Sequence, residues 1–530
     1  MSSRSWRLSG GLMVWCASAT LLSACGGGSD VDASTASSQA ADESTDAQIL
    51  ALTGRKWTVG RLLEPGNFSD LNDRPVSSHA AGIADSGNVL VTFVKSDGTR
   101  NVLYAVRGTP SAGTASPVWS APKAIDIGAG GAFAPTQINS GWSLGLAVAP
   151  GGKAYATWVA QASCTATTYK TLGSCYFLYG AAFDGTNWLS PELIGDTPRS
   201  FGAPIPRIND NGDIAVLYEG YVRVGASATS NVAVASRNLG QVGFFKSALG
   251  AWSLSTARLL GQHVDLQLDA NSNLTLAGSF PLNTTVDNIV AYRGLVGKAL
   301  GSQVVLDTQA TSARFIGLAM APGGRSFAAW AQPNTSSGTV WASATSAVGN
   351  PWVATNTGVA ALAPLSYTYR LVGLTNGSAE LYLDNPAVVG DTNCARRRWT
   401  PALPTWTAQT LPSGCAGWQQ GYAVATASNG NQLWLRNTSA WSSFDDALNQ
   451  IVKPMASAGS SAASDYILGF SNGNASVLGA SLGATSVLLS PSGVAAILTR
   501  NDFDTLPTAT TAGIRRPSSR GNNLWGWYFK

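Results

Sequence analysis

Residues 145–158 read GLAVAPGGKAYATW, and residues 317–330 read GLAMAPGGRSFAAW. Nine of the fourteen positions are identical, although the two copies stand far apart in the chain. Each copy holds an apolar stretch, a Gly-Gly turn and a second stretch in which side chains alternate in character. A period of two is typical of β-strands. Each copy therefore predicts two strands joined by a tight turn.

Looser copies of this phrase recur along the chain, for example SGNVLVTF ending at Phe93 and NGDIAVLY ending at Tyr218. Their turn positions follow one another at nearly regular intervals. The predicted turn residues are Gly87, Gly152, Gly212, Ser272, Gly324, Gly377, Gly430 and Gly493. Gly473 resembles a further turn, but it lies much closer to Gly493 than any two turns of the series lie to each other, and we assign it to the long seventh unit.

Each unit also predicts a third strand and a fourth strand that begins at a Trp. The fourth strands read WSAPKAI from Trp119, WLSPELI from Trp188 and WSLSTARLL from Trp252. Repeated units of four strands at this length are typical of β-propeller blades, which bury both sheet faces by stacking in a ring. We therefore predict an all-β fold, a β-propeller of eight four-stranded blades, with seven or nine blades as alternatives.

The two ends of the domain are complementary. It begins with KWTVGRLLEP near Trp57, a fourth strand without the first three, and it ends with three strands without a fourth, from SVLLSPSGVAAILTR to LWGWYFK. We expect the N-terminal strand to join the last blade, because a ring closed in this way has no exposed sheet edge.

The first 25 residues predict an export signal. Arg4 and Arg7 precede an apolar stretch over residues 10–22, which is too short to span a bilayer. The sequence LSAC at residues 22–25 then resembles the lipobox of bacterial lipoproteins. This resemblance implies cleavage before Cys25, a lipid on Cys25 and, because Gly26 follows, attachment to the outer membrane. An ordinary secretory signal with an incidental Cys is the alternative.

The predicted organisation thus has three parts: a lipoprotein signal over 1–24, a lipidated Cys and tether over 25–50, and the propeller over 51–530. The tether is rich in Gly, Ser, Ala, Asp and Thr, and a segment of this composition cannot bury enough apolar surface to fold. We expect the protein in the bacterial cell envelope, on the periplasmic or the outer leaflet side of the outer membrane.

Charge gives little sign of nucleic-acid binding. The chain carries a net charge of +4, and only 12% of its residues are charged. Its one dense basic run is Arg396-Arg397-Arg398. We expect this run to be a solvated loop, with contact to phosphate or an anionic glycan as the alternative.

Four cysteines remain after the signal region, an even number in an oxidising compartment. Cys164 and Cys175 are near neighbours in the sequence, and so are Cys394 and Cys415. Locality favours the pairs 164–175 and 394–415 among the three pairings that are open. Zinc ligands usually have tighter C-x2-C spacing, which the sequence lacks.

Catalytic motifs are few. The chain has two histidines, His79 and His263, and neither a G-x-S-x-G elbow nor an H-E-x-x-H motif accompanies them. We expect no metal and no cofactor. A sialidase-like glycoside hydrolase is the enzymatic alternative, because such enzymes resemble this architecture and need only two carboxylates. The carboxylates that stand in predicted turns are interpreted as turn caps: Asp85, Asp97, Asp184, Asp210 and Asp213.

Residues that enter the innermost strands of a propeller line the mouth of its channel. Aromatic and basic side chains there suit a sugar, peptide or anionic ligand. The predicted mouth residues are His79, Trp142, His263, Arg314, Tyr367, Arg370 and Trp418. We predict a lipid-anchored binding or scaffold protein for a glycan, peptide or envelope protein. The alternatives are the propeller hydrolase and a structural subunit of an outer-membrane complex.

Overall fold

The computed structural model describes strands and their connecting turns throughout the propeller region. The described residues are 61–64, 76–97, 100–111, 118–126, 137–138, 144–163, 174–195, 204–224, 227–241, 243–253, 264–281, 287–307, 313–321, 323–332, 338–345, 351–361, 368–374, 376–384, 395–409, 423–427, 432–437, 453–454, 465–470, 486–501 and 523–529. Within these ranges every regular element is a strand. No helix in this part of the chain has the length and apolarity to cross a membrane.

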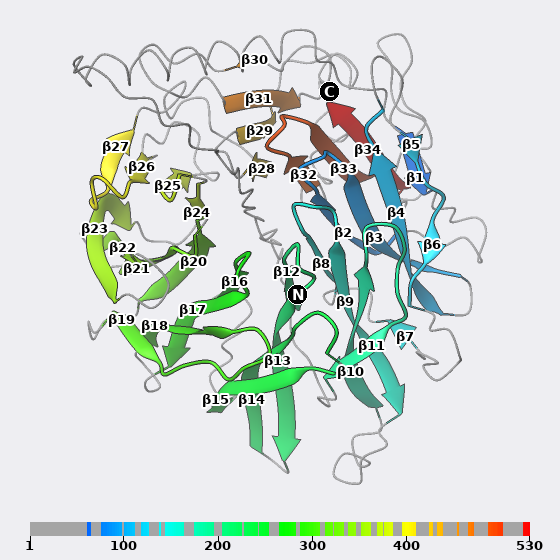
Figure 1. Ribbon diagram of the computed structural model, residues 1–530, viewed down its shortest axis with the longest axis horizontal. Coiled ribbons are helices and arrows are strands. Elements are labelled where there is room, and N and C mark those ends of the chain that lie inside the picture. The colour runs from blue at the N-terminus through cyan, green and yellow to red at the C-terminus, as the bar shows by residue number, and fades with distance from the viewer. Residues whose placement is uncertain are drawn as a thin grey trace, which may run out of the picture.

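The first four blades follow the predicted meander, with the first strand of each nearest the axis of the ring (Figure 1). Blade 1 contains β2 (Ser78–Ile83), β3 (Val89–Ser96), β4 (Asn101–Thr109), and β5 (Val118–Trp119) with β6 (Lys123–Ala124) at its outer edge. Blade 2 contains β8 (Gly145–Val148), β9 (Ala154–Ser163), β10 (Ser174–Phe183) and β11 (Glu192–Gly195), with β7 (Gln137–Ile138) also on β9. Blade 3 contains β12 (Ile205–Ile208), β13 (Ile214–Val224), β14 (Ser227–Arg237) and β15 (Phe245–Ser253). Blade 4 contains β16 (Val264–Leu268), β17 (Asn273–Pro281), β18 (Asp287–Leu295) and β19 (Val304–Asp307).

The described strands form four further sheets, eight in all. Blade 5 contains β20 (Arg314–Met320), β21 (Ser326–Gln332), β22 (Gly338–Thr345) and β23 (Trp352–Ala361). Blade 6 contains β24 (Thr368–Gly373), β25 (Ala379–Asp384), β26 (Ala395–Trp399) and β27 (Thr407–Gln409). Blade 7 contains β28 (Ala423–Thr426), β29 (Gln432–Asn437), β31 (Asp465–Phe470) and β30 (Lys453–Pro454). Blade 8 contains β32 (Ser486–Leu489), β33 (Ala495–Asn501), β34 (Asn523–Phe529) and β1 (Arg61–Glu64). The fold is an all-β propeller.

The first described strand lies in the last blade. β1 pairs antiparallel with β34, with Arg61 opposite Gly526 and Leu62 opposite Trp525. The N-terminal strand therefore stands where the sequence predicts it, although Trp57 itself lies outside the described residues.

Blade 7 departs from the antiparallel meander. β29 pairs with β31 in parallel, from Gln432 opposite Asp465 to Asn437 opposite Phe470. A parallel neighbour needs a long crossover, and the chain between the two strands, positions 438–464, is long enough to supply it. The predicted turn at Gly430 and the extra turn at Gly473 lie outside the described residues.

The predicted turns share one backbone geometry. Each described turn residue has a positive φ, from 65° at Ser272 to 94° at Gly152. In the turn of blade 2, Gly152 N donates to Ala149 O at 2.8 Å, and Ala149 N donates to Lys153 O at 2.6 Å. This is a type I turn closed by a bulge residue in the left-handed region, which favours glycine. The same positive φ occurs at Gly87, Gly152, Gly212, Ser272, Gly324, Gly377 and Gly493.

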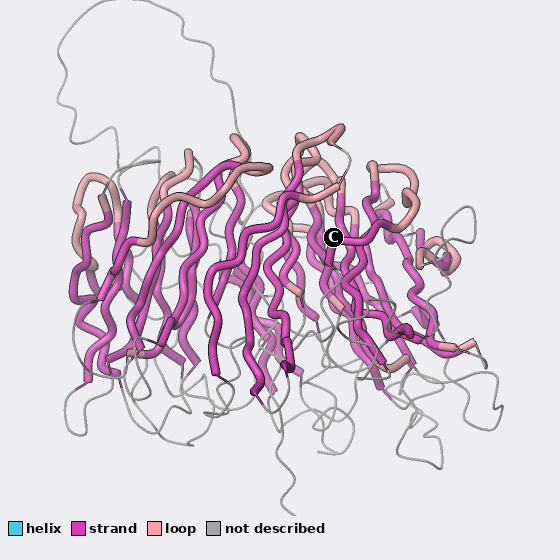
Figure 2. Tube along the Cα trace, turned by 90° about the horizontal axis from the view of Figure 1, so that it is seen from below, coloured by secondary structure: helices cyan, strands magenta, loops and turns pink. Residues whose placement is uncertain are grey.

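These turns define one face of the ring, which we call the turn face. In a four-stranded meander the hairpin between the third and fourth strands lies on the same face as the first hairpin. Seen from the side, the strands run between two faces, and most of the described turns gather at one of them (Figure 2). We call the opposite face, where the innermost strands begin, the entry face.

The hydrophobic core lies between the blades. Trp158 is 1% exposed and packs in a cluster shared by blades 1 and 2, with Leu90 and Leu146 among its members. Trp330 is also 1% exposed and packs in the matching cluster between blades 4 and 5. The aromatic end of the repeated phrase thus fills the space between blades.

In blade 1 the outer strands β5 and β6 lie within one residue of the stretch predicted from Trp119, whereas the start predicted at Trp252 in blade 3 is wrong. Trp119 ends β5 and is 6% exposed. In blade 3, however, the outer strand begins at Phe245, and Trp252 lies near its end, opposite Ser230. The strand therefore starts well before the position that the Trp signal gives. Phe245 is the first residue of this strand.

Candidate functional site

The structure describes only part of the predicted mouth. His79 lies on β2, Arg314 begins β20 and Arg370 lies on β24. Trp142, His263, Tyr367 and Trp418 lie outside the described residues. Cys25, Cys164, Cys394 and Cys415 also lie outside them, so both disulfides and the lipidation site stay predictions. Cys175 lies on β10, opposite Ala162 of β9.

Register from the turn places three polar residues at one level of the innermost strands. Asp265, Arg370 and Ser486 all stand at the same distance in sequence before the turn residue of their own blade. His79 Nε2 lies 3.1 Å from Ser486 Oγ, a contact that joins β2 to β32. The predicted residues His79 and Arg370 therefore belong to strands that surround the axis at about the same height.

A polar cluster that the sequence analysis did not name lies on blades 3 to 5. Arg207 of β12 donates from Nη2 to Asp265 Oδ1 of β16 at 3.0 Å. Gln267, two residues further along β16, donates from Nε2 to Asp265 Oδ2 at 3.4 Å and to Leu318 O of β20 at 3.1 Å. These side chains bridge three consecutive innermost strands. We call Arg207, Asp265 and Gln267 the channel cluster.

Burial acts on both charges of this cluster. It lowers the pKa of the Arg207 guanidinium, and the Asp265 carboxylate opposes that shift. It also raises the pKa of Asp265, while Arg207 and the hydrogen bonds from Leu266 N and Gln267 oppose it. Yet the Arg207 and Asp265 side chains keep 13% and 25% of their surfaces exposed. Both stand on innermost strands, and these exposed fractions mean that solvent reaches the pair.

A buried ion pair rarely stabilises a fold more than apolar side chains of similar volume would. A partly exposed ion pair on the innermost strands is therefore a candidate for recognition of a ligand. The sequence held one signal for it: Asp265 has the same distance from its turn as Arg370. The predicted mouth residue His263 stands two positions earlier in the sequence.

A second pair of charged groups lies on the turn face. Gly151 N donates to Asp210 Oδ1 at 2.6 Å, and Asp85 N donates to Pro150 O at 3.0 Å. Burial, and then repulsion from Asp210, raise the pKa of Asp85 to about 6. The two carboxylates therefore interact across the turn of blade 2. The sequence predicts that each of these carboxylates caps its own turn, but Asp210 accepts a hydrogen bond from the turn of the neighbouring blade.

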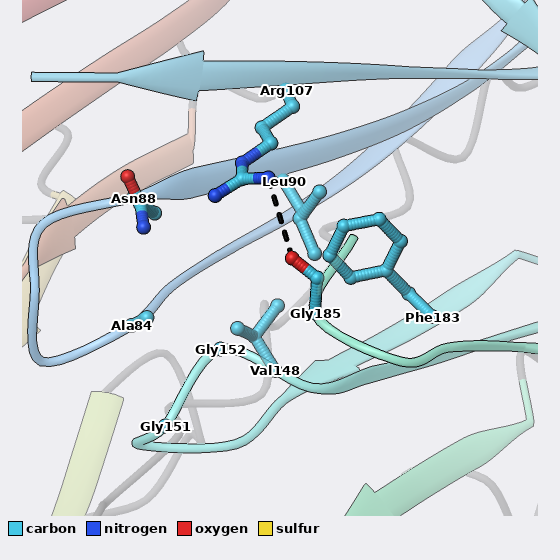
Figure 3. A pocket seen from close by; sticks show the side chains of 9 residues that line it. All are labelled: Ala84, Asn88, Leu90, Arg107, Val148, Gly151, Gly152, Phe183 and Gly185. Atoms are coloured by element: carbon cyan, nitrogen blue, oxygen red, sulfur yellow. Dashed lines mark hydrogen bonds between the residues drawn. The ribbon is translucent and has the colours of Figure 1, made fainter. Parts of the chain in front are cut away.

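A small pocket joins blades 1 and 2 on this face (Figure 3). Arg107 donates from Nη1 to Gly185 O at 3.3 Å, and its guanidinium lies 5.9 Å from the centre of the Phe183 ring. The cavity measures about 40 Å³, which is room for a water or two. It is too small for a sugar or a peptide side chain, and its Arg107 holds the two blades together.

The basic run at 396–398 is a strand, so the expectation of a solvated loop was wrong. Arg396 donates to the carboxylate of Glu380 from Nη2 at 3.0 Å, and Arg398 donates to it from Nε at 2.7 Å. Arg397 donates to Thr357 O of blade 5 at 3.1 Å. Glu380 is 1% exposed. The run is ordered because a buried carboxylate needs paired charges, and the sequence does not show which acid opposes it.

Within the described ranges no group of three or more His, Cys, Asp or Glu side chains is arranged to hold a metal ion. No protein-family model matches the chain, and no curated protein sequence matches it.

Solved propeller structures resemble the fold at low sequence identity. An intramolecular trans-sialidase from Ruminococcus gnavus is 9% identical, over 63% of this chain and 96% of that one, with a TM-score of 0.32. The β-propeller domain of the Trilobed protease from Pyrococcus furiosus is 8% identical, over 65% and 87%, with a TM-score of 0.29. An α-L-arabinofuranosidase from Fusarium graminearum is 10% identical, over 73% and 92%, with a TM-score of 0.34.

Proposed function

We propose that this protein is a ligand-binding propeller, held at the bacterial outer membrane by a lipid on Cys25. Its ligand is a glycan, a peptide or a segment of an envelope protein, and it binds in the central channel. The observation that carries the proposal is the Arg207–Asp265 ion pair, which stands on the innermost strands and stays partly exposed. A guanidinium and a carboxylate together can bind ligand hydroxyl, amide and charged groups.

The mature chain with Cys25→Ser is the protein for the test, because it cannot carry the proposed lipid. Arrays of envelope glycans and peptides are probed for saturable binding. Arg207→Gln and Asp265→Asn should then each lower the affinity for the ligand by at least about tenfold, since each leaves one buried charge without its partner.

Arg100→Gln is the matched control. Arg100 and Asp126 form an ion pair of 2.6 Å in blade 1, where Arg100 precedes β4 and Asp126 follows β6, away from the innermost strands. Its loss should change stability without changing ligand affinity. Equal loss of binding in the control and the channel variants would place the ligand outside the channel.

A hydrolase remains the second candidate, because Asp85 and Asp210 interact and the pKa of Asp85 is about 6. Glycoside hydrolysis needs one carboxyl group that stays protonated near neutral pH and one carboxylate. Mass analysis of any ligand that binds would separate the candidates. Cleavage that disappears in Asp85→Asn would favour the hydrolase, and an intact ligand would favour binding alone.

A structural subunit of an outer-membrane complex is the third candidate. It needs a continuous apolar surface on the ring. Copurification of a membrane partner with the lipidated chain, in amounts that survive washing, would favour it over the channel ligand.

A further inference from the structure

Large apolar side chains that are strongly exposed gather at one place in the described chain. All ten of them lie at the hairpin between the third and fourth strands, or in the fourth strand that follows it. They come from blades 1 to 6. They are Val118, Leu189, Leu193, Leu239, Phe245, Leu295, Val304, Val305, Val353 and Leu403, and each is 40% to 64% exposed. We call these ten residues the apolar rim.

The topology places the hairpin residues of the apolar rim at the turn face. Hairpins between third and fourth strands lie on that face, and the fourth strand starts there. Leu239 stands in the hairpin of blade 3, and Leu295 ends β18 at the hairpin of blade 4. Phe245 lies opposite Ser236, near the turn-face end of β14. Leu193, Val304 and Val305 lie further along their outer strands, opposite the middle of the third strand. The rim therefore follows the outer edge of six consecutive blades, and its hairpin residues lie on the turn face.

Nothing in the cores of the blades requires these side chains. Leu239 and Leu403 are 64% and 61% exposed, so each has most of its surface in water. Single exposed leucines are ordinary on protein surfaces. Exposed leucines at the same hairpin of several blades, however, are typical of an interaction surface. These are Leu189, Leu239, Leu295 and Leu403.

The chain before β1 indicates what covers this face. β1 is the outer strand of blade 8, and it runs from Arg61, opposite Gly526, to Glu64, opposite Leu524. Fourth strands run away from the turn face, so Arg61 is the end of β1 nearer to that face. The predicted tether, residues 25–50, joins the chain on the N-terminal side of β1. We expect a coil of the tether's length to span about 25–31 Å.

A lipid on Cys25 would therefore keep the turn face within a few nanometres of a bilayer. At such a separation even weak apolar contacts act at high effective concentration. Leucine, valine and phenylalanine at hairpin tips suit the boundary between headgroups and acyl chains.

We infer that the apolar rim docks on the surface of the lipid bilayer that carries the Cys25 anchor. The turn face then points toward the membrane, and the entry face with its predicted mouth residues points away from it. This inference rests on the proposed lipid anchor, but the rim itself acts without the lipid.

The test uses the mature chain with Cys25→Ser and vesicles of phosphatidylethanolamine and phosphatidylglycerol. Flotation measures the bound fraction. The parent should bind, and the triple variant Leu239→Ser, Leu295→Ser, Leu403→Ser should bind at least about tenfold less tightly, since each leucine loses apolar contact with lipid. Added salt should change the binding of the parent little, because apolar contacts are not screened.

Ser302→Asn is the matched control, because Ser302 lies in the same hairpin as Leu295, is exposed, and the change alters no charge. It should change vesicle binding by less than about twofold. Leu239→Ser alone, with an unchanged thermal midpoint, serves if the triple variant folds poorly. A smaller loss of binding in this single variant still supports the rim.

Three outcomes overturn the inference. The first is a lipid-free parent that does not float with vesicles, and the second is a triple variant that floats as well as its parent. The third is a rim that instead holds two copies together, shown by a dimer that the triple variant loses without any vesicle binding. None of these bears on the channel ligand, whose dependence on Arg207 is measured without lipid.

Discussion

Blades 2 and 5 carry the two near-identical phrases, and their differences lie where each blade meets its neighbours. The backbone is the same in both: the turn glycines Gly152 and Gly324 have φ of 94° and 80°, and the closing Trp158 and Trp330 are 1% exposed. Five positions differ between the two phrases, and some of them make polar contacts with other strands. The shared glycine and tryptophan maintain the same blade structure in both copies, and the exchanged residues determine how each blade contacts its neighbour.

Position 155 and its counterpart 327 show this most clearly. Tyr155 donates from its hydroxyl to Glu192 Oε1 at 2.9 Å, and Arg237 of blade 3 donates to the same oxygen at 2.8 Å. Phe327 instead packs edge-on against Trp399 of blade 6, with ring centres 5.2 Å apart. One copy therefore joins its neighbour through charge, and the other through aromatic contact.

Position 154 and its counterpart 326 differ in the same way. Ala154 is a buried methyl group in blade 2. Ser326 lies 3.0 Å from Thr275 Oγ1 of blade 4 and accepts from Arg293 Nη2 at 3.0 Å. One hydroxyl thus adds a polar contact between blades 4 and 5, and an alanine cannot make the matching contact between blades 1 and 2.

The largest expected effect comes from the residue that the copies share. Trp158→Ala and Trp330→Ala should each lower the free energy of unfolding by about 3–5 kcal/mol, since each leaves a cavity between two blades. Urea unfolding measures both. Neither indole Nε1 has a hydrogen-bond partner, so Trp→Phe at the same positions should cost much less. Equal losses in the Ala and Phe variants would mean that packing volume is not what these residues supply.

Exchange of the aromatic position should hurt both copies, for different reasons. Phe327→Tyr places a hydroxyl in the cluster around Trp399, and a buried hydroxyl without a partner costs about 1–3 kcal/mol. Tyr155→Phe removes one hydrogen bond but leaves Glu192 paired with Arg237, so about 1 kcal/mol is expected. Urea unfolding of the two variants side by side gives the order. A smaller loss in Phe327→Tyr than in Tyr155→Phe would contradict it.

The turn position separates glycine from its one serine substitute. Gly152→Ala should cost about 1–2 kcal/mol, because its φ of 94° strains any side chain while the added Cβ meets only Ala84, at 3.9 Å. Ser272 adopts a φ of 65° and bonds to Asp213 and Asn209. Ser272→Gly loses those hydrogen bonds but relieves the backbone strain, so its stability should be nearly unchanged. Ser272→Ala loses the hydrogen bonds and keeps the strain, so it should be less stable. Thermal midpoints decide, and a Ser272→Ala variant as stable as Ser272→Gly would show that the bonds contribute nothing.

The basic residues that follow the two turns, Lys153 and Arg325, should differ less in their contribution to stability. Arg325 donates to Gly377 O at 3.4 Å and lies 4.9 Å from the centre of the Trp399 ring, while Lys153 donates to Asp210 O at 2.7 Å. Arg325→Ala should cost about 1 kcal/mol, and Lys153→Ala about half of that. Arg325→Lys is the control that keeps the charge. If it restores full stability, stacking on Trp399 is not what separates the two copies.

The fold was largely predictable because its rules are local. Alternation and turn residues repeat in every unit, and each of the seven predicted turn residues within the described ranges has the positive φ that the pattern requires. The polar contacts were less predictable, because their partners come from different strands or blades. Asp265 is opposed by Arg207 of the preceding blade, and Glu380 by two arginines of the next strand.

The same distinction explains the errors. Trp252 marks a strand by its size, but nothing local indicates whether a Trp begins or ends it. The run at Arg396 has the composition of a solvated loop, but it forms a strand in which Arg396 pairs with Glu380 of the neighbouring strand. Contacts between strands decide both cases, and composition does not encode them.

The smallest expected effect concerns pH, and it belongs to one copy only. The turn of blade 2 lies between Asp85 and Asp210, whereas the turn of blade 5 has Ala270 and Thr375 at the corresponding positions. Asp85 has a pKa of about 6 in the folded chain, above its ordinary 3.8. The folded state therefore holds an extra proton between these values, and stability contributed by Asp85 should fall as pH rises from about 4 to about 6.

Asp210→Asn tests the coupling directly. It removes the repulsion but leaves the burial, which is the larger cause, so the pKa of Asp85 should fall and still stay above 3.8. An NMR titration of the Asp85 carboxyl carbon measures this. Asp184→Asn is the control, because hydrogen bonds from Asn187 N and Thr186 N lower the pKa of that carboxylate in its own turn. An Asp85 titration that is the same with and without Asp210 would mean that burial alone raises it, and the carboxylate pair required for hydrolysis would lose its support.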